Sequence, residues 1–189
     1  MAKDSQRLEQ EFILICREKT GHTLDEWFTT IRQSGETKPA SMLNWLKATH
    51  KLNHMQANFL SSMYLNDGKP VFDYEVLFNR LFEGKEQLLD TYRAIEVTMK
   101  QVGSDVDLIP TKAYVSVEGK KIFGCITPTK TLLRVGLDLG DTPFSNYTQK
   151  AKSLGAMPNL THMIEVAHSN DVNEAFATQA MKAYQRVHP

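Results

Sequence analysis

The stretch VDLIPTKAYVSVEGKKIFGCITPTKTLLRVGLDL, residues 106–139, decides the fold. It contains four short β-rich runs separated by turn-forming residues: Val106–Ile109, Ala113–Val117, Lys121–Thr127 and Leu132–Leu139. This alternation is typical of neighbouring antiparallel strands. Gly119 lies in the reversal between the second and third runs, where a tight hairpin turn requires a positive φ angle. A fifth run, Leu160–Ala167, follows a long polar connection, so we predict a largely antiparallel sheet of about five strands.

The fourth run predicts which side chains face the core. Side chains alternate along a strand, so Leu133 and Leu137 point one way, whereas Arg134 and Asp138 point the other way. In the fifth run, His162 shares its side with the apolar residues of that run. We therefore expect helices to cover the face that carries the leucines.

Helical segments lie on both sides of this region in the sequence. Apolar residues recur at helical spacing in four early segments: Ser5–Lys19, Thr23–Ser34, Ser41–Ala48 and Asn53–Tyr64. Capping boxes at Thr23/Glu26 and Asn53/Gln56 mark the starts of the second and fourth segments, and Ser41 is a plausible cap of the third. Later helices start near Asp73, Leu88 and Asp171. The turn formers Asn66–Pro70 indicate a boundary. We predict an α+β protein with a four-helix module at residues 1–66 and a sheet domain at residues 71–189.

The charge balance argues against a generally basic or acidic surface. Lys and Arg number 22, as do Asp and Glu, and neither side of Asn66 carries a large excess of one sign. Neither half is therefore expected to attract nucleic acid or an anionic membrane as a whole. The chain begins with a polar segment, and Cys16 and Cys125 are widely spaced in apolar company. We expect a cytoplasmic location, with no membrane among its partners.

Short segments of both parts resemble known families. Lys19–Thr23, Trp45–Lys47 and Leu52–Ala57 are similar to the helical domain of unknown function 4287. The later part resembles the domain of unknown function 5655 in six segments: Phe82–Lys85, Tyr114–Ser116, Ile126–Pro128, Leu133–Leu137, Thr161–Ile164 and Ala183–Tyr184. Together the two resemblances span nearly the whole chain and imply a bacterial-type protein. They bring no established reaction and no catalytic residues.

Two histidine patterns raise the question of a metal site. His162, Glu165 and His168 offer zinc-ligand chemistry, but in a strand His162 and Glu165 fall on opposite faces. His50 and His54 have the i, i+4 spacing of a helical metal site, yet the residues between them read as a turn between helices. We therefore expect neither a metal nor a cofactor, and interpret His162 as a structural histidine bonded to a neighbour.

Nucleophile motifs are equally weak. Cys125 lies in the middle of a predicted strand, where a thiol is buried and inert, and Ser116 lacks a G-x-S-x-G context. The segment Gly136–Gly140 lacks the spacing and the strand-to-helix context of a phosphate-binding loop. Of three functional classes, a binding or interaction protein, a nucleic-acid-associated protein and an enzyme, the enzyme is therefore the least favoured.

One sheet face offers a candidate binding surface. We expect Arg134 and Asp138 to line the face away from the leucines, joined by side chains of the neighbouring strand: Tyr114, Ser116 and Lys112. An aromatic ring beside basic and hydroxyl groups suits a small anionic or nucleotide-like ligand. Gly124 is expected to leave room above this face, and the Gly140–Pro158 connection, with Lys150 and Lys152, to close over it. The bland interpretation is a solvated face or one covered by the helical module.

The favoured function is a non-enzymatic binding or interaction protein whose partner is a small ligand or a protein. The alternative is a nucleic-acid-associated accessory protein, because Ser41–Ala48 and Asn53–Tyr64 resemble a helix-turn-helix. The second of these helices offers Gln56 and Asn58, but no Lys or Arg lies between Asn53 and Asp67. Phosphate contacts dominate DNA affinity, so this composition favours ordinary helix packing.

Overall fold

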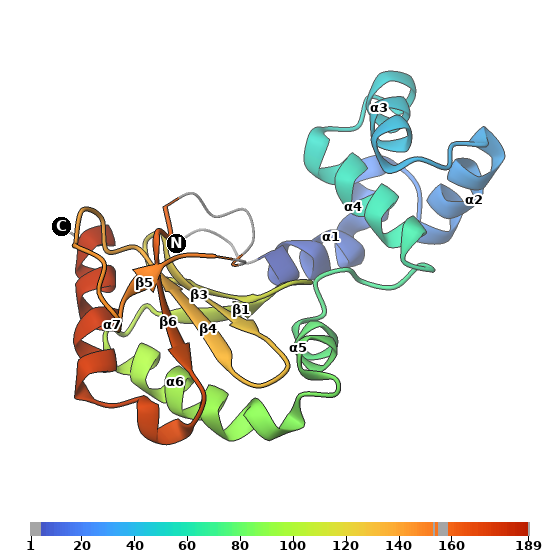
Figure 1. The fold of residues 1–189 in the computed structure, drawn as a ribbon. Helices are drawn as coiled ribbons and strands as arrows, with labels where there is room; N and C mark the ends of the chain where they lie inside the picture. Colours follow the sequence, from blue (N-terminus) through green and yellow to red (C-terminus); the bar gives the residue numbers. More distant parts are fainter. Residues whose placement is uncertain (1–4, 153, 155–158, 189) are drawn as a thin grey trace. The chain divides into compact units, whose positions relative to one another are not determined.

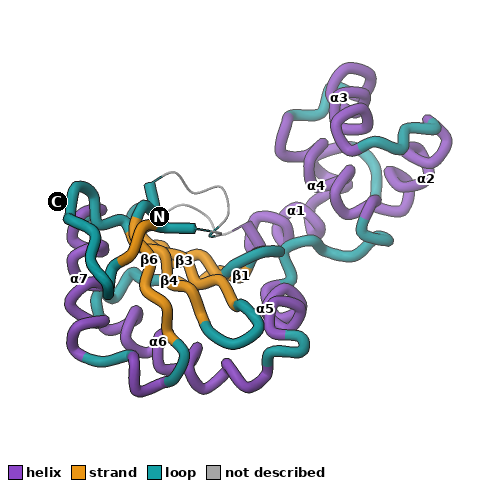
Figure 2. Tube along the Cα trace, viewed as in Figure 1, coloured by secondary structure: helices purple, strands orange, loops and turns teal. Residues whose placement is uncertain are grey.

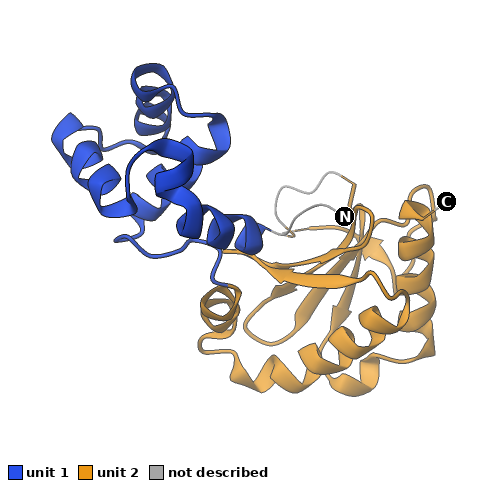
Figure 3. Ribbon diagram, turned by 180° about the vertical axis from the view of Figure 1, so that it is seen from behind, with its two compact units in different colours: residues 1–73 blue, residues 74–189 orange. Residues whose placement is uncertain are grey.

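The computed structural model describes residues 5–152, 154 and 159–188 and divides the chain into two compact units, Met1–Asp73 and Tyr74–Pro189 (Figure 3). The described part of the first unit is helical. Its four helices are α1 (Ser5–Thr20), α2 (Leu24–Ser34), α3 (Pro39–His50) and α4 (His54–Leu65), labelled in Figure 1. None of the helices in the described ranges is both long enough and apolar enough to cross a bilayer.

The helix ends of the first unit follow from local side-chain chemistry. Thr23 and Glu26 form the predicted capping box of α2, since the Glu26 N–H donates to Thr23 Oγ1 (3.3 Å) and the Thr23 N–H to Glu26 Oε2 (2.7 Å). Asn53 and Gln56 do the same for α4. The predicted cap Ser41 is wrong. Helix α3 starts at Pro39, because proline fits the first turn of a helix, and the Ser41 hydroxyl bonds Glu36 instead.

The short joint between α3 and α4 separates the two histidines of the i, i+4 pattern. Lys51 follows α3 with a positive φ of 58°, and α4 begins at His54. His50 and His54 therefore belong to different helices, as predicted.

A buried carboxylate fixes the end of the first unit. Glu9 of α1 is fully buried, and its two oxygens accept hydrogen bonds from the N–H groups of Val71 and Phe72 at 2.9–3.0 Å. The Phe72 ring also packs edge-on against Phe59 of α4. These contacts hold the chain to the helical core beyond the predicted boundary at Asn66–Pro70, and the division between units comes after Asp73.

The second unit combines three α-helices with a sheet in the residues that the structure describes (Figure 2). Its helices are α5 (Tyr74–Phe82), α6 (Leu89–Gln101) and α7 (Glu174–Val187), with 3-10 turns η1 (Glu86–Leu88) and η2 (Ser169–Asp171). Its strands are β1 (Asp107–Pro110), β2 (Val115–Glu118), β3 (Ile122–Pro128), β4 (Leu133–Leu137), β5 (Gln149–Lys150) and β6 (His162–Val166).

The sheet has the order β1-β2-β3-β4-β6-β5, and every neighbouring pair is antiparallel. The predicted α+β architecture with an antiparallel sheet is therefore confirmed. Within the described ranges the sheet has six strands rather than five, because two residues of the long connection, Gln149 and Lys150, pair with β6. So short a strand carries too little hydrophobic pattern to be read from the sequence.

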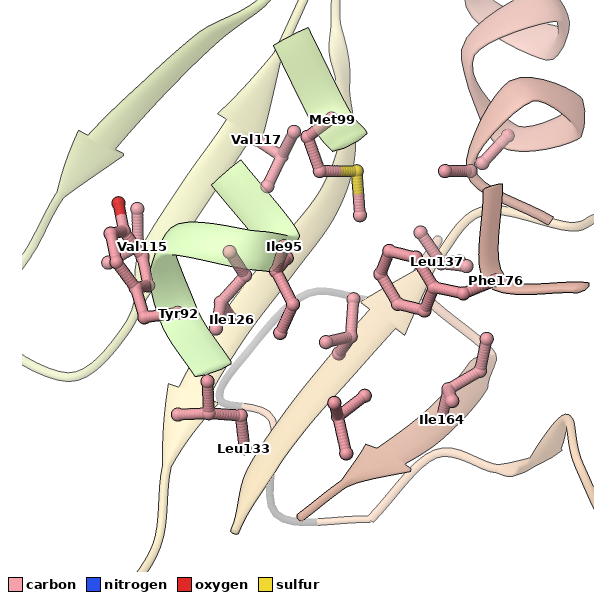
Figure 4. Close-up of a cluster of buried hydrophobic side chains, with 14 of the residues drawn as sticks. Tyr92, Ile95, Met99, Val115, Val117, Ile126, Leu133, Leu137, Ile164 and Phe176 are labelled. Carbon is pink, nitrogen blue, oxygen red and sulfur yellow. The ribbon is translucent and has the colours of Figure 1, made fainter. Parts of the chain in front are cut away.

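Helices α6 and α7 cover one face of the sheet and form the main core with it (Figures 1 and 4). The core side chains of the strands include Val115, Val117, Ile126, Leu133, Val135, Leu137, Ile164 and Val166, and those of the helices include Tyr92, Ile95, Met99 and Phe176. The expectation that the leucines of β4 face the helices is confirmed.

Gly119 has a different role from the predicted one. Its φ angle is not positive, unlike those of Gly21, Gly35 and three other glycines. A Cβ atom on Gly119 would lie 2.5 Å from Cε1 of His188, so glycine is required by the close approach of this ring. The reversal between β2 and β3 therefore depends on a contact that is distant in the sequence.

His188 belongs to a cluster that ties the end of α7 to the segment before β1. Asp105 accepts a hydrogen bond from the Tyr184 hydroxyl (2.7 Å) and contacts His188 Nε2 (2.7 Å). The rings of Tyr184 and His188 stack with centroids 4.0 Å apart. The Tyr184 bond, followed by that of His188, holds the pKa of Asp105 below its ordinary value.

We predict that Glu9→Ala lowers the free energy of unfolding of the first unit by about 2 kcal/mol, because two backbone N–H groups lose their acceptor. The two tryptophans, Trp27 and Trp45, both belong to this unit, so urea unfolding followed by tryptophan fluorescence reports on it specifically. Glu18→Ala, at an exposed pair with Lys19, is the control and should change stability by less than about 0.5 kcal/mol. Equal effects of both substitutions would contradict the role of Glu9.

A second prediction concerns pH. Because the pKa of Asp105 is lowered in the folded state, its carboxylate stabilises the fold above the ordinary Asp pKa, and this contribution is lost as pH falls through the folded pKa. Asp105→Asn should therefore destabilise the second unit at pH 5.5, and the difference from wild type should shrink toward pH 3. Unfolding by urea, followed by circular dichroism, measures this, with the exposed Asp107→Asn as the matched control. A difference that is independent of pH would contradict it.

Candidate functional site

The sheet has a second face, opposite α6 and α7, which we call the outer face. Side chains alternate along each strand, so the neighbours of the core residues point to it. Its described side chains include Tyr114 before β2, Ser116 and Glu118 of β2, Cys125 and Thr127 of β3, Arg134 of β4, and Met163 and Glu165 of β6. The chain thus brings polar and apolar groups from four strands together on one surface.

One half of the outer face is covered by the chain itself. Cys125 and Met163 are buried together with Leu154 and Leu160, and Tyr114 and Ala151 pack against them. We call this group the apolar cluster. It shows that part of the long connection lies on the outer face, while Lys150 and Lys152 remain exposed.

Gly136, rather than Gly124, makes room on the outer face. A Cβ atom on Gly136 would lie 2.6 Å from Leu154 Cδ1 and 3.0 Å from Cys125 Sγ. A Cβ on Gly124 would instead meet Leu137 and Val117 on the core side. The expected space above Gly124 is therefore wrong, and the space above Gly136 is filled by Leu154.

The other half of the outer face is polar and centres on an ion pair. Arg134 lies directly opposite Glu165 of β6, and its Nε donates to Glu165 Oε1 at 3.2 Å. The two side chains are 25% and 30% exposed, so the pair is partly shielded from water. On its other side Arg134 lies opposite Thr127 of β3. Tyr114 lies on the far side of Thr127 in the same row across the strands. Val115 pairs with Ile126, so the antiparallel register places the residue before Val115, which is Tyr114, opposite Thr127.

Three of the five predicted site residues share the outer face: Tyr114, Ser116 and Arg134. Ser116 is buried and donates its hydroxyl hydrogen to Glu118 Oε1 at 2.9 Å. Lys112 is exposed in the turn before β2. It belongs to no strand, and its part in a binding site stays a prediction.

Asp138 does not join Arg134. Strand β4 ends at Leu137, and Asp138 Oδ1 accepts a hydrogen bond from Arg186 Nε of α7 at 3.1 Å. The Asp138 carboxylate is therefore engaged by α7, and the expectation that it joins Arg134 in one site is wrong. A bond to a residue so distant in the chain is not visible in the sequence pattern.

Thr127 and Glu165 were missed as members of this surface. Nothing in the sequence of either strand marks Thr127 or Glu165 as a site residue. Their relation to Arg134 is visible only in the strand pairing, where Thr127 and Glu165 lie directly opposite Arg134 on its two sides. For Glu165 the signal is an opposite charge directly facing Arg134, whereas Thr127 is identified only by its position opposite Arg134 in the register.

The thiol on this face is inert. Burial raises the pKa of Cys125 to about 11, against smaller opposite effects of the Gly136 backbone and the Thr127 hydroxyl. A thiol with such a pKa stays protonated near neutral pH and is a poor nucleophile. Burial likewise raises the pKa of Tyr114, with Cys125 and Glu118 acting in the same direction.

His162 is a structural histidine, as predicted. It is fully buried on the core side, with Nε2 2.7 Å from the Thr142 carbonyl oxygen and Nδ1 3.0 Å from Thr161 Oγ1. Nε2 therefore carries the hydrogen that is donated to the carbonyl, and Nδ1 accepts from the hydroxyl. Glu165 lies on the outer face. Within the described ranges, no three His, Cys, Asp or Glu side chains group as a metal site requires.

The family model described as Domain of unknown function (DUF5655) matches residues 79–186, more than half of the chain. The chain belongs to this family. A second model, Domain of unknown function (DUF4287), matches residues 10–66. Both families and their order agree with the resemblance seen in the sequence. Comparisons with curated proteins and with solved structures found no match.

The DUF5655 match contains both faces of the sheet. The outer face therefore lies within the family domain. Its polar half, formed by Tyr114, Thr127, Arg134 and Glu165, is the candidate site of this DUF5655 protein.

We predict that Gly136→Ala lowers stability by about 1–3 kcal/mol, because the new methyl group overpacks Leu154 and Cys125. In a Leu154→Ala background the same substitution should cost at least about 1 kcal/mol less, because the closest clashing atom is gone. Urea unfolding of the two single variants and the double variant, followed by circular dichroism, measures this coupling. Additive effects would mean that Leu154 does not rest on Gly136.

Proposed function

We propose that the second unit is a non-enzymatic binding module that holds a small anionic ligand at Arg134 on the outer face. The observation that carries this proposal is the state of the guanidinium. It is partly exposed and is held through Nε alone by Glu165, and no described residue accepts a hydrogen bond from its two terminal amino groups. An arginine that is oriented but still has free donors is prepared for an anion.

The chemistry of guanidinium suits a planar oxyanion. Its paired N–H groups match the two oxygens of a carboxylate, and such charge-assisted hydrogen bonds are about twice as strong as neutral ones. Partial burial increases the attraction, since the effective dielectric constant near the protein surface is lower than that of water. Glu165 fixes the orientation of Arg134 and so reduces the entropy lost on binding.

The neighbours of Arg134 provide for the rest of a ligand. Thr127 and Tyr114 continue the same row, and the ring of Tyr114 also packs against the apolar cluster. The Thr127 hydroxyl oxygen is itself buried, so a small ligand on this surface meets the charged group of Arg134 and the aromatic side chain of Tyr114. Binding sites typically combine apolar surface with a few such polar groups.

Binding is favoured over catalysis by the state of the nucleophile candidates. The pKa of Cys125 is raised to about 11 by burial, so its thiol stays protonated. Ser116 is buried, and its hydroxyl hydrogen is engaged by Glu118. We place this function in the cytoplasm, in line with two buried cysteines that are both free thiols.

A nucleic-acid-associated role is the alternative proposal. The three-residue joint between α3 and α4 gives it geometric support. Helix α4 contains no Lys or Arg, whereas phosphate contacts supply most of the affinity for DNA. We therefore rank it below ligand binding by the sheet.

The proposal predicts that anionic metabolites raise the melting temperature of the protein in a thermal-shift library. Arg134→Lys keeps the charge but not the fork of donors, and should weaken a hit at least about tenfold, as expected from losing a hydrogen bond to a charged group. Tyr114→Ala should weaken the same hit through lost contact area.

Arg93→Gln provides the matched control, because Arg93 forms an exposed ion pair with Asp90 on α6. It should leave every hit unchanged. Hits that survive both Arg134→Lys and Tyr114→Ala would place the site elsewhere, and a library without hits would contradict the proposal.

A further inference from the structure

The ion pair on the outer face leaves binding capacity on both of its members. Only Arg134 Nε and Glu165 Oε1 are joined, at 3.2 Å. The guanidinium keeps its terminal amino groups, and the carboxylate keeps Oε2, for which no described residue provides a hydrogen-bond donor. A ligand that approaches this pair thus finds a positive group and a negative group side by side.

The charge balance of the pair restricts the class of ligand. Arg134 and Glu165 sum to zero, so a dianion such as a phosphate monoester would be repelled by Glu165 while it is attracted by Arg134. A monoanion can bind the terminal amino groups of Arg134, but it leaves Glu165 Oε2 without a donor. A ligand that carries both charges avoids both costs.

The spacing favours an α-amino acid. In such a molecule one carbon atom separates the ammonium from the carboxylate, which suits charged partners whose nearest atoms are 3.2 Å apart. The carboxylate would accept from the terminal amino groups of Arg134, and the ammonium would donate to Glu165. Each charge of the ligand and of the protein would then have a partner of opposite sign.

The protein side chains next to Arg134 on the outer face indicate which kind of side chain the bound amino acid carries. The short Thr127 lies between the long side chains of Arg134 and Tyr114. Two strand spacings, about 9.6 Å, separate the outer members of this row. A planar ring above Thr127 would contact the guanidinium and the Tyr114 ring, both of which bind aromatic faces well.

We propose that the ligand of the outer face is a zwitterionic amino acid with an aromatic side chain. Its carboxylate binds Arg134, its ammonium binds Glu165, and its ring lies above Thr127 toward Tyr114. This inference rests on the proposed binding function and adds to it the second charge and the ring.

Four phenyl compounds test the charge requirement by isothermal titration calorimetry on the full chain. L-phenylalanine carries both charges, 3-phenylpropionate only the carboxylate, 2-phenylethylamine only the ammonium, and phenyl phosphate is a dianion. L-phenylalanine should bind, and the other three compounds should bind at least about tenfold more weakly, the loss expected for one charge-assisted contact.

Substitutions at the pair assign each charge. Glu165→Gln keeps the size of the side chain and should reduce L-phenylalanine to the affinity of 3-phenylpropionate, while leaving 3-phenylpropionate no weaker. Arg134→Gln should abolish the preference for a carboxylate. Arg93→Gln is the control for both, and melting curves show that each variant is folded.

The outcomes separate the two proposals. If 3-phenylpropionate binds as tightly as L-phenylalanine and Glu165→Gln changes neither, the zwitterion is wrong and anion binding at Arg134 stands. If phenyl phosphate binds best, the zwitterion is again wrong. If none of the four compounds binds, the inference is overturned, and a metabolite library that also yields no hit overturns the binding function with it.

Discussion

The register of β3, β4 and β6 is the constraint on which the second unit depends. In this register Cys125, Gly136 and Met163 face one another in one row, and Thr127, Arg134 and Glu165 in the next. A slip of one residue would move every side chain of a strand to the other face and place Arg134 among the leucines of the core. Burying an unpaired guanidinium costs several kcal/mol, so the register that forms the core also forms the ion pair.

The same alternation explains how much of the fold could be predicted. Four β-rich runs, the helical periodicities and the capping boxes at Thr23 and Asn53 are local signals, and each is confirmed. Asp138 shows where local signals end. Its carboxylate accepts a hydrogen bond from Arg186 of α7, a partner far away in the sequence that no local pattern identifies. Gly119 is similar, because the ring of His188 determines why a glycine stands there.

The end of the helical unit illustrates the same limit. The turn formers Asn66–Pro70 are visible in the sequence, but the Glu9 carboxylate that holds the following two residues is not. Nothing distinguishes Glu9 from the other acidic residues of α1 until its burial is known. Interactions between a side chain and a distant backbone leave no periodic trace, and so they escape any reading based on patterns.

The candidate site was only partly predictable, because local patterns do not reveal contacts between residues distant in the sequence. Tyr114, Ser116 and Arg134 follow from alternation within single strands, whereas Thr127 and Glu165 follow only from the pairing of strands. The cover on the outer face was expected from the long connection, but its anchor, Leu154 above Gly136, depends on three-dimensional packing. Alternation thus predicted part of this face, and the pairing of strands identified its other members.

The partial burial of the Arg134–Glu165 ion pair determines how it could take part in ligand binding. A fully buried Arg134–Glu165 pair would have exchanged its hydration for fixed partners, and a ligand would have to break that pair to bind. A fully exposed pair would be weak, about 1 kcal/mol or less. At about one quarter exposure, the pair is held by one hydrogen bond, and its remaining donors and acceptor have no partner among the described residues. In the proposed binding mode a ligand would use these remaining groups and leave the ion pair intact, so recognition would not act against the stability of the sheet.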